Sequence, residues 1–145
     1  IALNSENDDW SPCLSADGEL LIFTSNRANE HLADEFGRYD NEIYFSTLDK
    51  RKWTAIEAIT TLNTSEDDAV GGLSYDGQRL LIYKIENENA DVFESKLNGT
   101  KWESPVRKMG KAGLRKVSGS VNSGQVRQNM GGLGEKLRNR LKREG

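Results

Sequence analysis

The residues of this chain best suited to chemistry are acidic side chains that come in pairs. Asp8-Asp9 and Glu66-Asp67-Asp68 lie 59 positions apart, as do the steps Asp17-Gly18 and Asp76-Gly77. Paired carboxylates serve general acid–base catalysis and cation binding. A calcium loop needs carboxylates at alternating positions and a distal glutamate, which neither stretch provides. Asp-Gly between apolar runs is a strong hairpin signal because both residues tolerate positive φ, so we expect turns at both steps.

Histidine occurs once, at His31. A single histidine without a second His or Cys partner makes a weak metal site, and a Ser-His-Asp mechanism would depend on it alone. The sequence has no nucleophile elbow, phosphate-binding loop, nucleotide fingerprint or zinc motif. We therefore expect a protein that is not an enzyme and needs no cofactor or metal.

The spacing of 59 belongs to an internal repeat, which must be found before any element is assigned. Residues 3–25 match residues 62–84 at that offset, and residues 43–53 match residues 92–102 at an offset of 49. The first copy therefore carries ten extra residues, which fall within 26–41. Two registers on either side of one insertion indicate a duplicated unit.

Each copy predicts four short antiparallel strands joined by turns, because short apolar runs alternate with Asp, Asn and Gly. The run Leu20–Thr24 is nearly continuous in apolar residues, which favours burial on both faces. No stretch before residue 110 has convincing helical periodicity. The expected strands are 10–15, 20–24, 42–48 and one beginning at 52–53 in the first copy, and 70–74, 79–84, 91–97 and one beginning at 101–102 in the second.

Four strands in 50–59 residues, repeated, are typical of propeller blades. The two copies resemble the TolB-type, WD40-like β-propeller repeat of bacterial cell-envelope proteins. The motif stands here as Asn4-Ser5, Asp9, Pro12, Ser15, Asp17-Gly18, Leu21, Phe23 and Ser25, followed by Asn26-Arg27. The second copy departs from it at Gly71, Ile82 and Lys84.

The resemblance implies an all-β fold of two four-stranded antiparallel blades that form part of a larger propeller. In such repeats the acidic pair bonds backbone amides in the loop that enters the innermost strand, and the recurring Trp53 and Trp102 pack between strands or blades. Two blades cannot close a propeller, which usually takes four to eight. We therefore expect the remaining blades to come from a longer parent chain or from another subunit.

The domains expected are a blade at 1–61 with its insertion at 26–41, a second blade at 62–109, and a basic tail at 110–145. Inserted loops on a rigid scaffold often carry recognition. Either the insertion contacts another protein or it is a solvated loop. Its candidate binding residues are Arg27, His31, Phe36, Arg38 and Tyr39.

Charge is divided sharply along the chain. Residues 1–105 hold 9 basic and 21 acidic residues, whereas residues 106–145 hold 11 and 2. The Gly-rich tail is expected to be disordered or to order on a partner, with a short helix at 135–144 and Leu137 and Leu141 as anchors. An acidic protein surface is the favoured partner, because the tail has no aromatic residue to stack bases or anchor at a membrane. No apolar run is long enough to cross a bilayer as a helix.

These features together predict a non-enzymatic scaffold or protein-binding propeller segment. The resemblance implies a periplasmic or outer-membrane-associated complex of the bacterial envelope, with a peptidoglycan-linked or outer-membrane partner or a role in secretion. Two alternatives stay open. One is the propeller of a prolyl-oligopeptidase-like peptidase whose catalytic domain lies outside this sequence. The other makes the basic tail a binder of nucleic acid or anionic surfaces.

Overall fold

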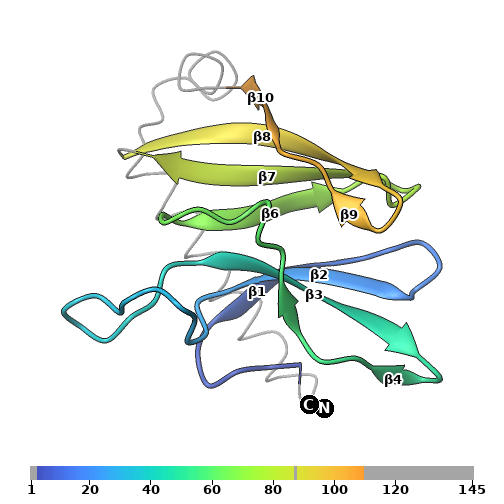
Figure 1. Ribbon diagram of the computed structural model, residues 1–145, viewed down its shortest axis with the longest axis horizontal. Helices are drawn as coiled ribbons and strands as arrows, with labels where there is room; N and C mark the ends of the chain where they lie inside the picture. The colour runs from blue at the N-terminus through green and yellow to red at the C-terminus, as the bar shows by residue number, and fades with distance from the viewer. Residues whose placement is uncertain (1–2, 87, 110–145) are drawn as a thin grey trace.

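A computed structural model describes residues 3–86 and 88–109 of the 145-residue chain. These residues form ten β-strands in two antiparallel sheets and contain no α-helix (Figure 1). The expectation of an all-β fold is therefore confirmed for the described residues. The predicted tail, with Leu137 and Leu141, lies outside them. Within the two described ranges no helix has the length and apolar character that crossing a membrane requires.

The first sheet is built on three strands that pair in chain order, β1 (Asp9–Leu14), β2 (Leu20–Ser25) and β3 (Glu42–Asp49). The far edge of β3 pairs with two short segments, β4 (Lys52–Trp53) and β5 (Glu57–Ala58). As its apolar sequence predicts, β2 lies in the middle of this sheet and is buried over Ile22–Ser25. The single fourth strand of the prediction is thus two strands separated by a short connection.

The second sheet repeats this plan strand by strand. Its three long strands are β6 (Asp68–Leu73), β7 (Arg79–Glu86) and β8 (Asn89–Asn98). The edge of β8 pairs with β9 (Lys101–Trp102) and β10 (Val106–Met109). The first strands of both sheets even carry a bulge at the same place, between Trp10 and Cys13 in β1 and between Val70 and Gly72 in β6. The duplication seen in the sequence is therefore a duplication of backbone structure.

Both Asp-Gly steps form the predicted hairpins, but by a different turn. Within these two Asp-Gly steps only the glycines have a positive φ, 75° for Gly18 and 69° for Gly77. Each turn is closed by a bond from the glycine N–H to the carbonyl of the serine three residues earlier, Ser15 or Ser74. Asp17 Oδ1 accepts bonds from the Ser15 hydroxyl and the Glu19 N–H, and Asp76 repeats this pattern. The hairpin is thus a type I turn followed by a left-handed glycine, with the aspartate stabilising it.

The hydrophobic core lies between the sheets, with β6 next to the first sheet (Figure 1). The first sheet contributes the face that carries Ile22 and its register partner Phe45. The second contributes the face that carries Ile82 and its partner Phe93. By the offset of 59, Ile82 corresponds to Phe23, which points to the opposite face of β2 from Ile22. The two sheets therefore stack head to tail, each using a different face.

Trp102 takes the structural place expected of it, and Cys13 packs against the same core. Trp102 is buried in the core, and Trp53 is half-buried at the edge of the first sheet. Cys13 is a free thiol packed against the core, and burial raises its pKa. Both observations agree with packing roles.

Candidate functional site

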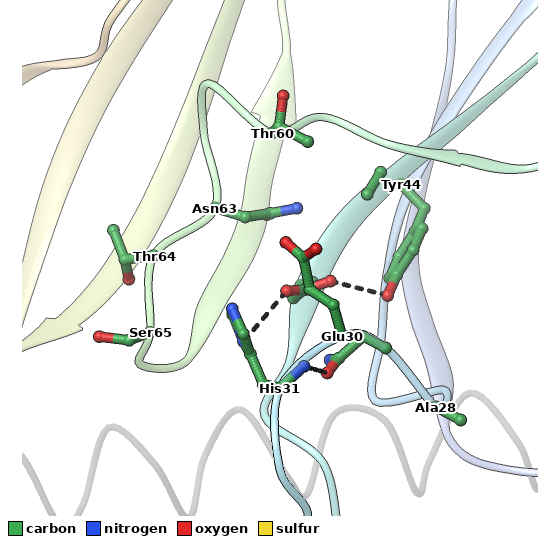
Figure 2. A pocket seen from close by; sticks show the side chains of 11 residues that line it. Ala28, Glu30, His31, Tyr44, Thr60, Asn63, Thr64 and Ser65 are labelled. Atoms are coloured by element: carbon green, nitrogen blue, oxygen red, sulfur yellow. Dashed lines mark hydrogen bonds and ion pairs between the residues drawn. The ribbon is translucent and has the colours of Figure 1, made fainter.

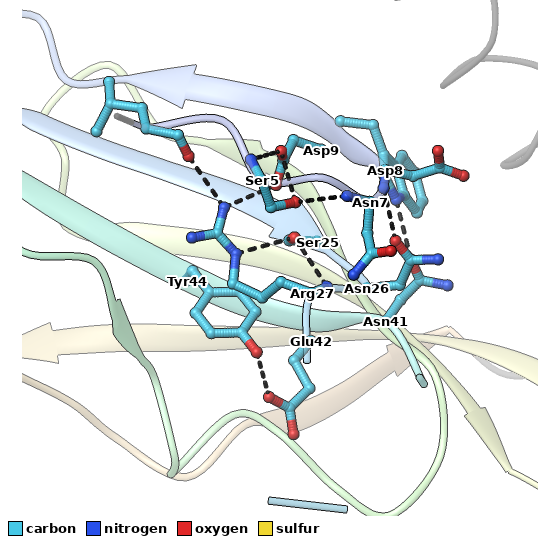
Figure 3. Close-up of polar contacts among 12 residues, drawn as sticks. Ser5, Asn7, Asp8, Asp9, Ser25, Asn26, Arg27, Asn41, Glu42 and Tyr44 are labelled. Atoms are coloured by element: carbon cyan, nitrogen blue, oxygen red, sulfur yellow. Dashed lines mark hydrogen bonds and ion pairs between the residues drawn. The ribbon is translucent and has the colours of Figure 1, made fainter. Parts of the chain in front are cut away.

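Arg27, the arginine of the repeat motif at the start of the insertion, packs against a face of the first sheet. Its guanidinium pairs with Asp9 at 2.7 Å and donates to the carbonyl of Leu3 at 3.0 Å (Figure 3). It also lies over the rings of Phe23 and Tyr44, with its Cζ 5.1 and 5.0 Å from their centroids. Its side chain is 18% exposed. The charge of Arg27 is therefore neutralised by Asp9 within the first sheet.

The second sheet builds the same ion pair from another position in the sequence. Lys84 Nζ pairs with Asp68 at 2.8 Å and donates to the carbonyl of Leu62. Asp68 and Leu62 correspond to Asp9 and Leu3 at the offset of 59, whereas Lys84 corresponds to Ser25. The cation is thus kept in place although the residue that supplies it has changed.

Asp9 and Asp68 hold the loops that enter β1 and β6. Asp9 Oδ2 accepts bonds from the N–H and the hydroxyl of Ser5, and Asp68 Oδ2 accepts the same pair from Thr64. Burial disfavours the charged form of Asp9, but the bonds from Ser25, Ser5 and Arg27 outweigh it and lower its pKa. The expected structural role of these carboxylates is confirmed.

The tip of the insertion is a small turn that Asp34 organises. Its carboxylate accepts bonds from the N–H groups of Phe36 and Arg38 and pairs with the Arg38 guanidinium at 2.8 Å. The Arg38 guanidinium lies over the Phe36 ring, whose residue is 73% exposed, and Leu32 is 94% exposed. Phe36 and Arg38 thus stand together at the tip, whereas Tyr39 is half-buried near its base. The structure does not bring these three residues together with Arg27.

His31 lines a pocket of about 510 Å³ between the insertion and the loop that enters β6 (Figure 2). The walls come from the start of the insertion, from β3 and β5, and from the loop before β6. The lining residues include Glu30, His31, Glu42, Tyr44, Ala58 and Ser65.

A buried carboxylate lies at the back of this pocket. Glu42 is 5% exposed and accepts a bond of 2.8 Å from the hydroxyl of Tyr44. His31 Nδ1 approaches Glu42 at 3.4 Å and makes no hydrogen bond. Burial together with the neighbouring Glu42 raises the pKa of Tyr44 well above its ordinary value, so its hydroxyl stays protonated. The lining includes Glu30 and Glu42 but neither lysine nor arginine, so the pocket is acidic.

The polar groups of this pocket include a carboxylate–histidine contact and a tyrosine hydroxyl. Within the described residues no hydroxyl is hydrogen-bonded to His31, so the carboxylate–histidine contact does not extend to a nucleophile. No group of three or more His, Cys, Asp or Glu side chains in the described part could hold a metal ion. What the pocket offers is one buried and one exposed carboxylate beside an aromatic ring.

The sequence predicted only His31 among the residues of this pocket. The sequence pattern places Glu42 and Tyr44 in a strand and does not mark Ala58 or Ser65 as a binding residue. A signal for them exists in the repeat. At the offset of 49, Glu42 aligns with Asp91 and Ala58 with Arg107, so a carboxylate recurs while a cation does not.

No family model and no curated protein matches the chain.

Proposed function

We propose that the chain is a non-enzymatic, protein-binding scaffold whose two sheets are consecutive blades of a TolB-type, WD40-like β-propeller. By that resemblance it belongs to a periplasmic or outer-membrane-associated complex of the bacterial cell envelope. Fold alone does not fix a function, so the proposal depends on how the sheets meet and on what their surfaces offer.

The observation that carries the proposal is the head-to-tail stacking of two repeated sheets. The face of the second sheet that points away from the first carries Leu81, which corresponds to the fully buried Ile22. Leu81 is 43% exposed, and Val106, on the same face, is 63% exposed. In a propeller this face would receive the next blade.

The same face also carries charge, which moderates the expected contact. Glu94 stands where the first sheet has Phe45, and it pairs with Lys108 at 3.4 Å. Interfaces between separate proteins are more polar than protein cores, but lysine and glutamate are depleted at their centres. We therefore expect this face to bind another sheet more weakly than the sheets of this chain bind each other.

Sedimentation velocity over a range of chain concentrations tests the proposal. The exposed face with Leu81 corresponds to the face with Ile22 that packs inside the chain. The outer face of the first sheet, with Phe23, corresponds to the face with Ile82. We therefore expect the face with Leu81 of one wild-type chain to pack on the outer face of the first sheet of another. Leu81→Lys should suppress the association by placing a charge in the contact. Tyr75→Lys is the matched control, since Tyr75 is 90% exposed on a hairpin loop away from that face.

A wild-type chain that stays monomeric and unfolds cooperatively at every concentration would contradict the stacking argument. Equal association of the two lysine variants would show that the contact lies elsewhere.

A further inference from the structure

The carboxylate and ring of the acidic pocket have counterparts in the second sheet, where an arginine pairs with the carboxylate. Asp91 and Phe93 occupy the positions of Glu42 and Tyr44. Arg107, in β10, pairs with Asp91 at 2.8 Å and places its Cζ 5.5 Å from the centroid of the Phe93 ring. The second sheet therefore combines a buried carboxylate, an aromatic ring and a guanidinium.

The first sheet keeps the carboxylate and the ring but has no counterpart of Arg107. The Arg27 guanidinium over the Tyr44 ring pairs with Asp9, as Lys84 beside Phe93 pairs with Asp68. Ala58 is the register partner of Tyr44 in β5, as Arg107 is of Phe93 in β10. A methyl group thus stands where the second sheet has a long cationic side chain, and Ala58 lines the pocket. Arg107 pairs with Asp91, whereas no lysine or arginine lines the pocket beside the corresponding Glu42.

Two further differences between the repeats make this space a site. The insertion, which the second sheet lacks, supplies a wall with Glu30 and His31, and the loop before β6 supplies Ser65. The carboxylate of Glu42 is bonded by the Tyr44 hydroxyl, so its position is fixed before any ligand arrives. Arginine suits a fixed carboxylate beside an aromatic ring better than lysine does, because its planar guanidinium can donate two parallel hydrogen bonds and stack on the ring.

We propose that this pocket binds the guanidinium group of an arginine side chain, supplied either by a partner protein or by the basic segment 110–145 of the chain itself. Glu42 accepts from the guanidinium, Tyr44 provides the aromatic surface, and Glu30 adds a second carboxylate at the entrance. The inference rests on the proposed protein-binding role and specifies the chemistry of the group recognised.

Nuclear magnetic resonance of the full ¹⁵N-labelled chain tests the proposal directly. The probes are N-acetyl-arginine amide, N-acetyl-lysine amide and N-acetyl-citrulline amide, the last being an uncharged shape analogue of the first. We expect the arginine probe to shift the backbone amides of His31 and Ser65, with an affinity about tenfold above that of citrulline. Equal binding of citrulline, or shifts confined to other parts of the chain, would overturn the proposal.

Two substitutions at the entrance give a matched pair. Glu30→Gln removes an exposed carboxylate of the pocket, and Glu35→Gln removes an exposed carboxylate of the same insertion that does not line it. Both residues are exposed, so the fold is kept in both variants. The first should weaken the arginine probe several-fold and the second should leave its affinity unchanged. Equal effects would show that only the overall charge of the insertion matters.

A third variant supplies the missing group from within. Ala58→Arg copies Arg107 into the first sheet, so it should abolish probe binding and raise the temperature of unfolding. Ala58→Met fills the space without charge, and it should block the probe without that gain. If Ala58→Arg does not raise the unfolding temperature above that of Ala58→Met, the pocket has no preference for a guanidinium and the proposal fails.

Replacing the five arginines of residues 110–145 by glutamine distinguishes the two sources. If that segment occupies the pocket, the amides of His31 and Ser65 move on substitution and the probe binds more tightly. If a partner supplies the arginine, the amides of His31 and Ser65 and the affinity for the probe stay the same. Failure of the probe in both chains overturns the pocket proposal. Self-association through Leu81 would still stand in that case, so the two proposals fail separately.

Discussion

Replacing Lys84 by serine removes the cation from the most buried ion pair of the described residues. The side chains of Lys84 and Asp68 are 5% and 0% exposed, and Lys84 Nζ also satisfies the carbonyl of Leu62. Breaking a buried pair on one side leaves an uncompensated charge, which costs about 3–5 kcal/mol. A domain of this size is stabilised by about 5–15 kcal/mol, so the loss should be a large share of the total.

The first sheet suggests how to repair this loss. It has serine at position 25 and a cation two residues later, at Arg27. The backbones match up to this point, because the Ile85 N–H bonds the carbonyl of Asp67 as the Asn26 N–H bonds that of Asp8. In the double variant Lys84→Ser/Glu86→Arg, an arginine therefore follows the serine in the same spacing. We expect it to restore about 2 kcal/mol of the lost free energy of unfolding, the value of one charged hydrogen-bonding contact.

Urea unfolding followed by tryptophan fluorescence, at a concentration too low for self-association, measures these differences. The exposed Lys96→Ser is the control, with an expected change within about 0.5 kcal/mol. Two results would refute the reasoning. One is a loss below about 1 kcal/mol for Lys84→Ser, because a buried unpaired carboxylate cannot be so cheap. The other is a double variant no more stable than the single one.

Three other changes have definite expected outcomes. The folded-state pKa of Asp9 lies below its ordinary 3.8. The contribution of Asp9 to stability is therefore complete above pH 3.8 and is lost as the pH falls through the folded-state pKa. Asp9→Asn should make the free energy of unfolding, measured with urea, less dependent on pH in the acid range. Arg51 has a φ of 66°, so Arg51→Gly should raise the midpoint of urea unfolding by relieving about 1 kcal/mol of strain, and a lower midpoint would contradict this. Ile82 is fully buried and Leu14 is 56% exposed. Thermal unfolding should therefore show that Ile82→Ala lowers the free energy of unfolding by about 2–5 kcal/mol and that Leu14→Ala lowers it much less. Equal losses would show that Ile82 does not belong to the core.

The long strands could be predicted from the sequence because local pattern and tertiary role agree in them. The run Leu20–Thr24 is apolar, and its backbone sits in the middle of a sheet. The short edge strand β5 could not be predicted, since Glu57 and Ala58 have low strand propensity. Their pairing is set by the free edge of β3, which no local window reveals. The connection between β4 and β5 splits the expected fourth strand for the same reason.

The candidate site was predicted only in outline. The insertion was identified correctly as the place where the repeats differ, and His31 does line the pocket there. Glu42 was not recognised, because a carboxylate at the start of a strand gives no sign in the sequence that it is buried. Arg27 was predicted to bind a partner, but its nearest charge is Asp9, 18 residues away in the sequence. Such ion pairs depend on which distant segments the fold brings together, and local sequence does not reveal this.

The exchange of Arg27 for Lys84 has a consequence for tracing the ancestry of such repeats. What has been kept is a positive charge at one point in space, while the alignment column that supplies it has moved by two residues. A duplicate that carried both cations at once could lose either of them without leaving its aspartate unpaired. Divergence through such an intermediate changes two columns while the ion pair stays intact. A column-by-column alignment therefore counts two mismatches at these positions. Physically, the same ion pair is present in both repeats.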